Sequence, residues 1–241
     1  MQFSDIAEEN MEALSRNTYP GRGIVIGGAP DGERFIQVYW IMGRSENSQN
    51  RIFVQERDTV RTQAYDESKV EDPSLIIYPC IKTLPRCHIV SNGDQTDTIF
   101  DAVRAGRTFE EAMFTRTFEP DEPNYTPRIA GIVNLNNAFH AYRLAIVKAV
   151  AGSGEYCQRH FFNYEKLIPG IGHCITTYEG DGDPLPAFPG EPYMLPLGDD
   201  IEETAERYWE ALNEDNRISL LVKAIDPETD RAQITIFNKH E

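Results

Sequence analysis

The sequence predicts an α+β fold in which antiparallel strands pack together and helices lie on the outer faces. Three observations support this class: blocks of β-branched and aromatic residues, separate amphipathic segments with capping residues, and an order in which strands do not alternate one for one with helices. A doubly wound parallel sheet needs that alternation, so the order disfavours it.

Composition excludes several classes of function. The chain has 241 residues, with 23 Lys and Arg against 39 Asp and Glu, which gives a net charge of −16. Such acidity disfavours a surface for duplex nucleic acid, because phosphate neutralisation needs a basic face. No apolar run is long enough to span a bilayer, and the first residues do not resemble a secretory signal. The four cysteines form no C-x-x-C pair, which favours a cytoplasmic protein with reduced thiols.

The first ninety residues predict one helix and about five strands. Phe3, Met11 and Leu14 recur at helical spacing over residues 3–16, before Pro20. Short β-branched and aromatic runs follow, and Asp31-Gly32 predicts a hairpin turn before the second of them. These runs cover residues 23–26, 35–42, 51–54, 75–78 and 88–90.

The rest of the chain predicts helices around a second β-rich block. Ile99 and Val103 share an apolar face that Gly106 ends, and Thr108–Glu111 is a capping box that opens the next helix. Residues 180–198 form a loop rich in Gly and Pro, long enough to cover a site. The remaining predicted elements are strands 129–133, 138–150, 157–164 and 171–178, a helix capped at Asp200, and strands 218–225 and 232–237.

Metal and nucleophile motifs are weak in this chain. Cys157, His160, His173 and Cys174 would supply two thiols and two imidazoles, but their spacing matches no zinc module, and we predict no metal. Cys80 remains open as a nucleophile, although a buried thiol is the default interpretation.

Polar side chains gather where three predicted strands end. Met42–Arg51 combines two arginines with hydroxyls and amides, Ile89–Asp97 turns tightly into a helix, and Glu122–Ile129 is a loop stiffened by two prolines. Such groups suit a phosphorylated small molecule. Ordinary turns and helix caps explain many of the same residues, so the residues alone predict only an α+β protein with polar loops fit for such a ligand.

Six sequence blocks carry a more specific signal, and they run in order from about residue 19 to residue 200. The blocks are Tyr19–Gly27, Gly43–Arg51, Ile77–Ile81, Val90–Asp97, Asn124–Gly131 and Asp183–Pro192. Together they resemble the archaeal-type inosine-monophosphate (IMP) cyclohydrolases and their bacterial relatives.

This resemblance implies a four-layer αββα sandwich, like that of the N-terminal-nucleophile hydrolases, with two mainly antiparallel sheets between helix layers. It implies a single domain over residues 19–241. The helix at residues 3–16 departs from the family pattern, so we expect residues 1–18 to form an N-terminal helical extension. No Ser, Thr or Cys heads the first core strand near Gly21-Arg22, and we expect no terminal nucleophile.

The implied activity is IMP cyclohydrolase, the last step of de novo purine synthesis. The carboxamide nitrogen of formamidoimidazole-carboxamide ribonucleotide attacks its own formyl carbon, and water leaves. We expect no metal or organic cofactor, no nucleic-acid or membrane partner, and a purine nucleotide as the substrate. Exposed sheet edges are compatible with a homo-oligomer. Two alternatives stay open: an amide hydrolase of the same layered fold, and a non-catalytic purine-nucleotide-binding relative.

The resemblance also implies roles for individual residues. Arg44 and Tyr78 are expected to donate to the formyl oxygen or relay a proton, and burial in an apolar segment would raise the pKa of Tyr78 and favour donation. Asn92 is expected to hold the carboxamide and Glu122 to accept a proton. The expected contacts to phosphate, ribose or base are Arg22, Ser45, Arg51, Asn124, Tyr125, Thr126 and Arg128.

Overall fold

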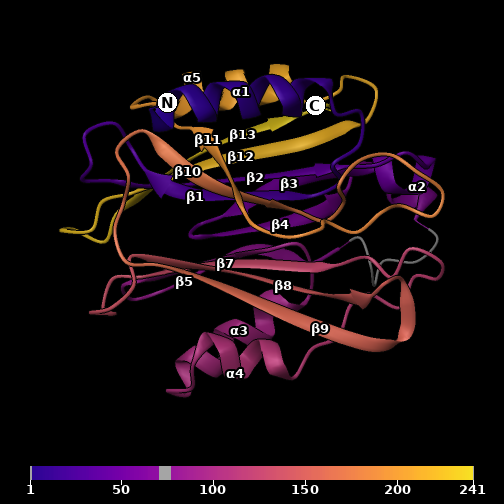
Figure 1. The fold of residues 1–241 in the computed structure, drawn as a ribbon, viewed down its shortest axis with the longest axis horizontal. Helices are drawn as coiled ribbons and strands as arrows, with labels where there is room; N and C mark the ends of the chain where they lie inside the picture. Colours follow the sequence, from indigo (N-terminus) through magenta and orange to yellow (C-terminus); the bar gives the residue numbers. More distant parts are fainter. Residues whose placement is uncertain (1, 71–76, 241) are drawn as a thin grey trace.

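A computed structural model describes residues 2–70 and 77–240. It confirms the predicted α+β class, with two antiparallel sheets and few helices. Figure 1 shows the two sheets lying face to face, with helices beyond each of them. Within the described residues, no helix is both long and apolar enough to cross a bilayer.

The first sheet has six strands in the order β11-β10-β1-β2-β12-β13. Neighbouring strands are antiparallel, and β1 and β2 form the predicted hairpin, in which Gly23 pairs with Trp40 and Gly28 with Phe35. The strands are β1 (Gly23–Gly28), β2 (Phe35–Met42), β10 (Ile171–Thr176), β11 (Tyr193–Pro196), β12 (Arg217–Ile225) and β13 (Ala232–Asn238).

The second sheet has seven strands in chain order from β3 to β9, again antiparallel. A short helix, α2 (Glu46–Gln49), joins β2 of the first sheet to β3 of the second. The strands are β3 (Arg51–Glu56), β4 (Thr59–Ala64), β5 (Pro79–Leu84), β6 (Cys87–Ser91), β7 (Arg128–Asn134), β8 (Tyr142–Val150) and β9 (Ser153–Tyr164), with the 3-10 turn η1 (Glu67–Lys69) after β4.

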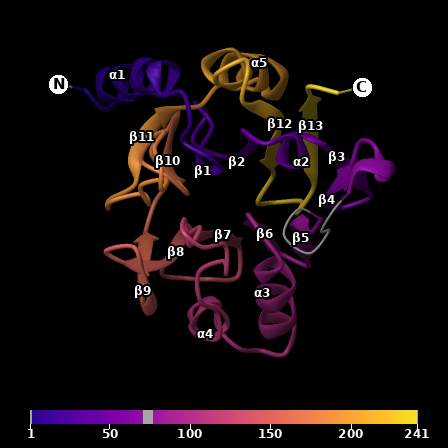
Figure 2. The same ribbon diagram turned by 90° about the vertical axis from the view of Figure 1, so that its right-hand side faces the viewer.

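Helices cover the outer faces of both sheets (Figure 2). The helices α1 (Phe3–Arg16) and α5 (Ile201–Ala211) pack on the six-stranded sheet, while α3 (Gln95–Arg104) and α4 (Phe109–Phe114) pack on the seven-stranded sheet. Each pair buries its apolar stripe against the strands beneath it.

Helix starts follow the sequence signals. The predicted capping box at Thr108 is confirmed: its hydroxyl accepts from Glu111 N at 3.1 Å, and its own N–H donates to the Glu111 carboxylate at 2.7 Å. Asp200 caps α5 by accepting from the backbone N–H groups of Glu202 and Glu203. These caps satisfy N–H groups that the first helical turn leaves without partners.

Several predicted strand extents differ from the structure. The strand predicted at 157–164 begins at Ser153, and the strand predicted at 171–178 ends at Thr176. The strand predicted at residues 75–78 begins instead at Pro79, and residues 75 and 76 lie outside the described residues. Strand β8 begins at Tyr142 rather than 138, because Asn137 Oδ1 accepts from the N–H groups of Phe139 and His140 and holds a turn there. The predicted loop over residues 180–198 contains β11, which pairs with the edge of β10.

Strand β4 was not predicted. Its sequence offers one strongly β-forming apolar residue, Val60, in an otherwise polar run. Val60, Thr62 and Ala64 nevertheless face inward on alternate positions, so the strand is defined by pairing with β3 rather than by its own composition.

Candidate active site

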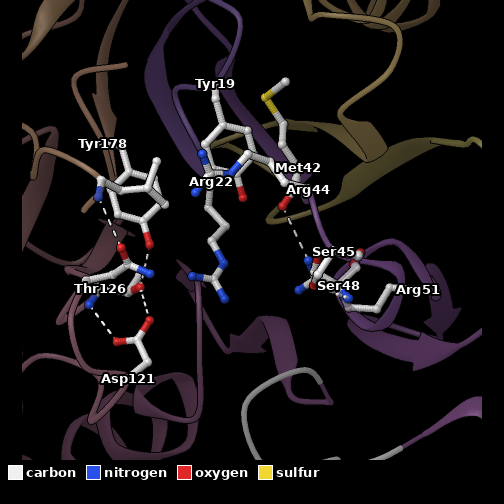
Figure 3. A pocket seen from close by; sticks show the side chains of 12 residues that line it. Tyr19, Arg22, Met42, Arg44, Ser45, Ser48, Arg51, Asp121, Thr126 and Tyr178 are labelled. Carbon is white, nitrogen blue, oxygen red and sulfur yellow. Dashed lines mark hydrogen bonds between the residues drawn. The ribbon is translucent and has the colours of Figure 1, made fainter. Parts of the chain in front are cut away.

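A pocket of about 320 Å³ opens at one end of the space between the sheets. This volume is within the usual range for small-molecule sites. Strand ends from both sheets supply its walls, and Figure 3 shows Arg22 reaching between the Asp121–Thr126 cluster and the Ser45–Arg51 segment. The lining residues are Tyr19, Arg22, Met42, Arg44, Ser45, Ser48, Arg51, Asp121, Asn124, Thr126, Tyr178 and Leu185.

Arg22 stands immediately before β1 and faces Glu119, with Nη1 3.5 Å from the Glu119 carboxylate. Its side chain is 13% exposed, and its Nε has no hydrogen-bond partner within the described part of the chain. Burial is the largest single influence and opposes the charge. The Glu119 carboxylate, together with nearby tyrosines, outweighs burial and holds the pKa of Arg22 above its usual value. Arg22 is therefore a cation with an N–H group left for a ligand.

Arg51 begins β3 and is almost completely buried beneath the pocket. Its Nε donates to the Ser48 carbonyl at 2.6 Å and Nη2 to the Met42 carbonyl at 3.4 Å, while Nη1 has no partner among the residues described. Burial lowers the pKa of Arg51. The pocket thus has a second buried guanidinium with an unused N–H group.

Tyr78 does not line the pocket but lies close behind it. Its hydroxyl is 2.9 Å from the hydroxyl of Tyr39, and both rings are buried. Burial raises the pKa of Tyr78, opposed by the positive charges of Arg22 and Arg51. The phenol is therefore protonated near neutral pH, which is the state that a hydrogen-bond donor requires.

A hydroxyl network forms the opposite wall. Asp121 Oδ1 accepts from the Thr126 N–H at 2.7 Å, and Oδ2 accepts from the Thr126 hydroxyl. Because that hydroxyl gives its hydrogen to the carboxylate, it accepts from the Tyr178 hydroxyl. The network fixes the loop before β7 against the end of β10.

Arg44 is placed at the rim. Its guanidinium donates to Asp181 at 2.6 Å and to the Gly182 carbonyl at 3.1 Å, and it stacks over the Tyr19 ring at 5.0 Å. Asn124 Oδ1 accepts from the Leu185 N–H at 3.0 Å. These contacts fasten the loop after β10 along one side of the pocket, where Leu185 forms part of the wall.

Asn92 and Arg128 lie outside the pocket lining, in a buried network beneath the loop. Asn92 Oδ1 accepts from the Ile129 N–H and from Gln95, and its Nδ2 donates to the Pro127 carbonyl. Arg128 donates to Asp94 at 2.7 Å and to Gln95 at 2.8 Å. Their polar groups hold the chain that carries Asn124 and Thr126.

Glu122 and Tyr125 are also outside the lining. Glu122 is exposed to solvent. The Tyr125 ring packs edge-on against Phe118 and lies over Gly154 of β9, on the far side of the loop. Burial and the nearby Glu122 carboxylate raise the pKa of Tyr125.

Glu119 is the carboxylate that sequence reasoning missed. It is 3% exposed, and its backbone N–H donates to the Thr126 carbonyl at 2.9 Å, across the loop. Burial raises the pKa of Glu119, and Arg22 partly offsets this effect. A buried carboxyl with a raised pKa beside an arginine is typical of groups that exchange protons.

The described side chains give little support to metal binding or to a cysteine nucleophile. Across the described residues, no three His, Cys, Asp or Glu side chains gather in an arrangement that would hold a metal ion. Cys80 is fully buried, donates to the Val60 carbonyl, and has its pKa raised by burial, so its thiol is a poor nucleophile.

Comparison with known proteins identifies the family of the chain. The family model for IMP cyclohydrolase-like proteins matches residues 19–230, which include every pocket residue. A protein named IMP cyclohydrolase from Methanothrix thermoacetophila is 32% identical over 170 residues, 68% of this chain and 76% of that protein.

Two further proteins named IMP cyclohydrolase are 30% identical. The Methanococcus maripaludis S2 protein matches over 57% of this chain and 72% of its own length. The match to the Methanococcus aeolicus protein covers 52% of this chain and 62% of that protein. On the extent of the family match, the chain belongs to the IMP cyclohydrolase-like family.

Proposed function

We propose that this protein is an IMP cyclohydrolase that closes the purine ring of formamidoimidazole-carboxamide ribonucleotide in the pocket around Arg22 and Arg51. The observation that carries the proposal is a cavity lined by the guanidinium groups of Arg22 and Arg51, with the Glu119 carboxylate 3.5 Å from Arg22. The protonated phenol of Tyr78 is buried behind the lining, where the charges of both arginines act on it. The family match over residues 19–230 supports the same reaction.

The reaction suits a site of this kind because nucleophile and electrophile belong to one molecule. Much of the entropic cost of bringing them together is already met once the formyl group is turned toward the amide. One proton leaves the carboxamide nitrogen and one leaves the formylamino nitrogen. Both protons end on the formyl oxygen, which departs as water. The site therefore needs a group that donates a hydrogen bond or proton to the formyl oxygen, and a group that accepts a proton.

Tyr78 is the proposed donor to the formyl oxygen, and Glu119 is the proposed proton acceptor. Burial keeps the Tyr78 phenol protonated and raises the pKa of Glu119 toward neutral pH, where a carboxyl exchanges protons most effectively. Glu119 replaces Glu122 in this role because Glu119 is buried and lies 3.5 Å from Arg22 of the pocket, whereas Glu122 is exposed to solvent.

Arg22 and Arg51 are proposed to bind the negative charge that the substrate already carries and to stabilise the negative charge that develops during the reaction. Donors aimed at a developing oxyanion are each worth about 3 kcal/mol. Ser45, Ser48 and Asn124 supply polar contacts for phosphate or ribose. Arg44 fastens the rim loop, and Asn92 and Arg128 support the loop before β7, as do the contacts of Tyr125 on its far side.

We also propose that the two sheets and their helices form the αββα arrangement of the N-terminal-nucleophile hydrolases, with residues 1–18 as an extension of a domain over residues 19–241. The three separate apolar cores, one between the sheets and one under each helix pair, support this arrangement. The cytoplasm, with its purine nucleotides, is the proposed location, and the net charge of −16 argues against a nucleic-acid substrate.

The direct test mixes purified protein with the formylated ribonucleotide and follows ultraviolet absorbance, with a chelator present and in parallel with the Cys80→Ala variant, since the Cys80 thiol is buried. We expect IMP to form in both samples at similar rates. Loss of activity in the folded Cys80→Ala variant would favour the amide-hydrolase alternative. Tight binding of IMP without any ring closure would favour the non-catalytic relative and contradict the proposal.

A further inference from the structure

Tyr39 lies at the centre of β2, faces the space between the sheets and is completely buried. Its ring stacks on Phe53 with centroids 5.5 Å apart. Among the described residues, its hydroxyl has one hydrogen-bond partner, the hydroxyl of Tyr78 at 2.9 Å. Tyr39 therefore ends the hydrogen-bonded chain and does not pass protons to solvent.

The direction of this hydrogen bond follows from where each hydroxyl finds an acceptor. If Tyr78 donated to Tyr39, the Tyr39 hydrogen would be left unpaired in the dry core, and buried unpaired donors are strongly disfavoured. If Tyr39 donates, the Tyr78 hydrogen is the free one. Tyr78 is 3% exposed whereas Tyr39 is completely buried, and the charges of the pocket residues Arg22 and Arg51 act on Tyr78. Of the two hydroxyls, Tyr78 is therefore the one that an acceptor on the pocket side can reach.

We propose that Tyr39 is a positioning residue that donates to the Tyr78 oxygen and so directs the Tyr78 proton into the pocket. The catalytic part of this inference rests on the proposed function, because in that reaction the Tyr78 proton is donated to the formyl oxygen. Tyr39 itself touches neither substrate nor reacting atoms. The same bond opposes the rise in the pKa of Tyr78 that burial causes, which makes Tyr78 the better acid.

The kinetic test compares Tyr39→Phe, Tyr78→Phe and the double variant. We expect Tyr39→Phe to lower kcat about 3- to 30-fold with KM nearly unchanged, since one hydrogen bond orients the donor. In the Tyr78→Phe background, adding Tyr39→Phe should lower kcat no further. Losses that multiply in the double variant, or an unchanged kcat in Tyr39→Phe, would overturn the inference.

A matched control is available at Tyr142, another buried tyrosine whose hydroxyl is hydrogen-bonded, at 2.6 Å to His173 Nδ1. Tyr142 is outside the pocket lining. Tyr142→Phe removes a buried hydroxyl of the same kind, so we expect lower stability with kcat retained. If the control lost as much kcat as Tyr39→Phe, the effect would be general loss of packing, and positioning would be excluded.

A second readout needs no catalysis and therefore separates this inference from the proposed function. With 3,5-difluorotyrosine in place of Tyr78, the phenol titrates at accessible pH and is followed by its fluorine resonance. Loss of the Tyr39 donor should raise the midpoint by about 0.5 to 1 pH unit in the Tyr39→Phe background. An unchanged or lower midpoint would show that Tyr39 does not donate to Tyr78.

Discussion

The site contains buried charged side chains that are not fully hydrogen-bonded, and this distinguishes it from the acidic surface around it. Arg51 and Glu119 are almost completely buried, and Arg22 is 13% exposed along its side chain. Free N–H groups remain on both arginines within the described chain. Burying charge in this way costs stability unless a ligand or partner compensates, so the arrangement indicates a binding site rather than a structural ion pair.

Replacing Tyr78 by Phe tests whether Tyr78 donates to the formyl oxygen. The substitution removes one hydroxyl and leaves the ring packed, so we expect kcat to fall by about 10- to 1000-fold while the protein stays folded. Steady-state kinetics with circular dichroism as the folding control measure this. Parent-like turnover in the variant would remove Tyr78 from the mechanism.

Glu119 and Glu122 form a matched pair of carboxylates on one loop, one buried and one exposed. Loss of the proton acceptor should make Glu119→Gln about 10²- to 10⁴-fold slower in kcat. Glu122→Gln should stay within about threefold of the parent, since surface changes rarely matter. The opposite order of the two rates would return the acceptor role to Glu122.

Sequence reasoning reached the polar residues at strand ends but not the buried carboxylate. Arg22, Arg44, Ser45 and Arg51 stand in glycine- or serine-rich segments that mark loops, and the structure brings all four to one pocket. Glu119 is one of 39 acidic residues and carries no local signal. Its burial comes from a contact with Arg22, 97 positions away, which no local pattern encodes.

At the scale of elements, composition predicted the strands that are apolar in themselves and missed those defined by pairing. β2 is buried at every position and its eight residues are β-branched, aromatic or otherwise apolar except one. β4 and β11 are short or polar, and pairing to a neighbouring strand makes them regular. Tertiary contact decides such cases because strand propensity depends on context.

Substitutions in helix α1 test whether the N-terminal extension contributes to stability rather than to catalysis. Leu14 is 3% exposed against the six-stranded sheet, whereas Phe3 is 53% exposed. Leu14→Ala should lower the free energy of unfolding by about 2–5 kcal/mol because it leaves a cavity. Phe3→Ala should change it by less than about 0.5 kcal/mol.

Urea denaturation measures both effects, and kinetics at a temperature where both variants are folded completes the test. We expect both variants to keep the parental kcat, because neither Leu14 nor Phe3 lines the pocket. A folded Leu14→Ala protein with strongly reduced kcat would connect α1 to the active site.

At the scale of the whole molecule, the space between the sheets is apolar along its length and polar at both ends. The pocket occupies one end. At the other, Lys223 of β12 is 1% exposed, its Nζ donates to Thr83 Oγ1 at 2.9 Å, and it lines a second cavity of about 600 Å³. Burial lowers the pKa of Lys223 to about 8.

This shift predicts how stability depends on pH. The unfolded lysine has a pKa of about 10.4, so between pH 8 and 10.4 the unfolded chain binds more protons and stability rises with pH. Below pH 8 the buried charge has its full cost, on the order of 3 kcal/mol.

Replacing Lys223 by Met should therefore stabilise the protein at pH 7, by up to about 3 kcal/mol, and the gain should shrink between pH 8 and 10. Urea denaturation of parent and variant at pH 7 and pH 10 measures the difference. A variant less stable than the parent at pH 7 would mean that the Lys223 charge is well compensated in the folded protein.

A crystal structure of the protein with IMP would show where the nucleotide binds. We expect the six-membered ring of the purine to lie between Arg22 and Arg51, with its edge within about 3.2 Å of the Tyr78 hydroxyl. Purine density at any other surface, with this pocket filled only by water, would contradict this expectation.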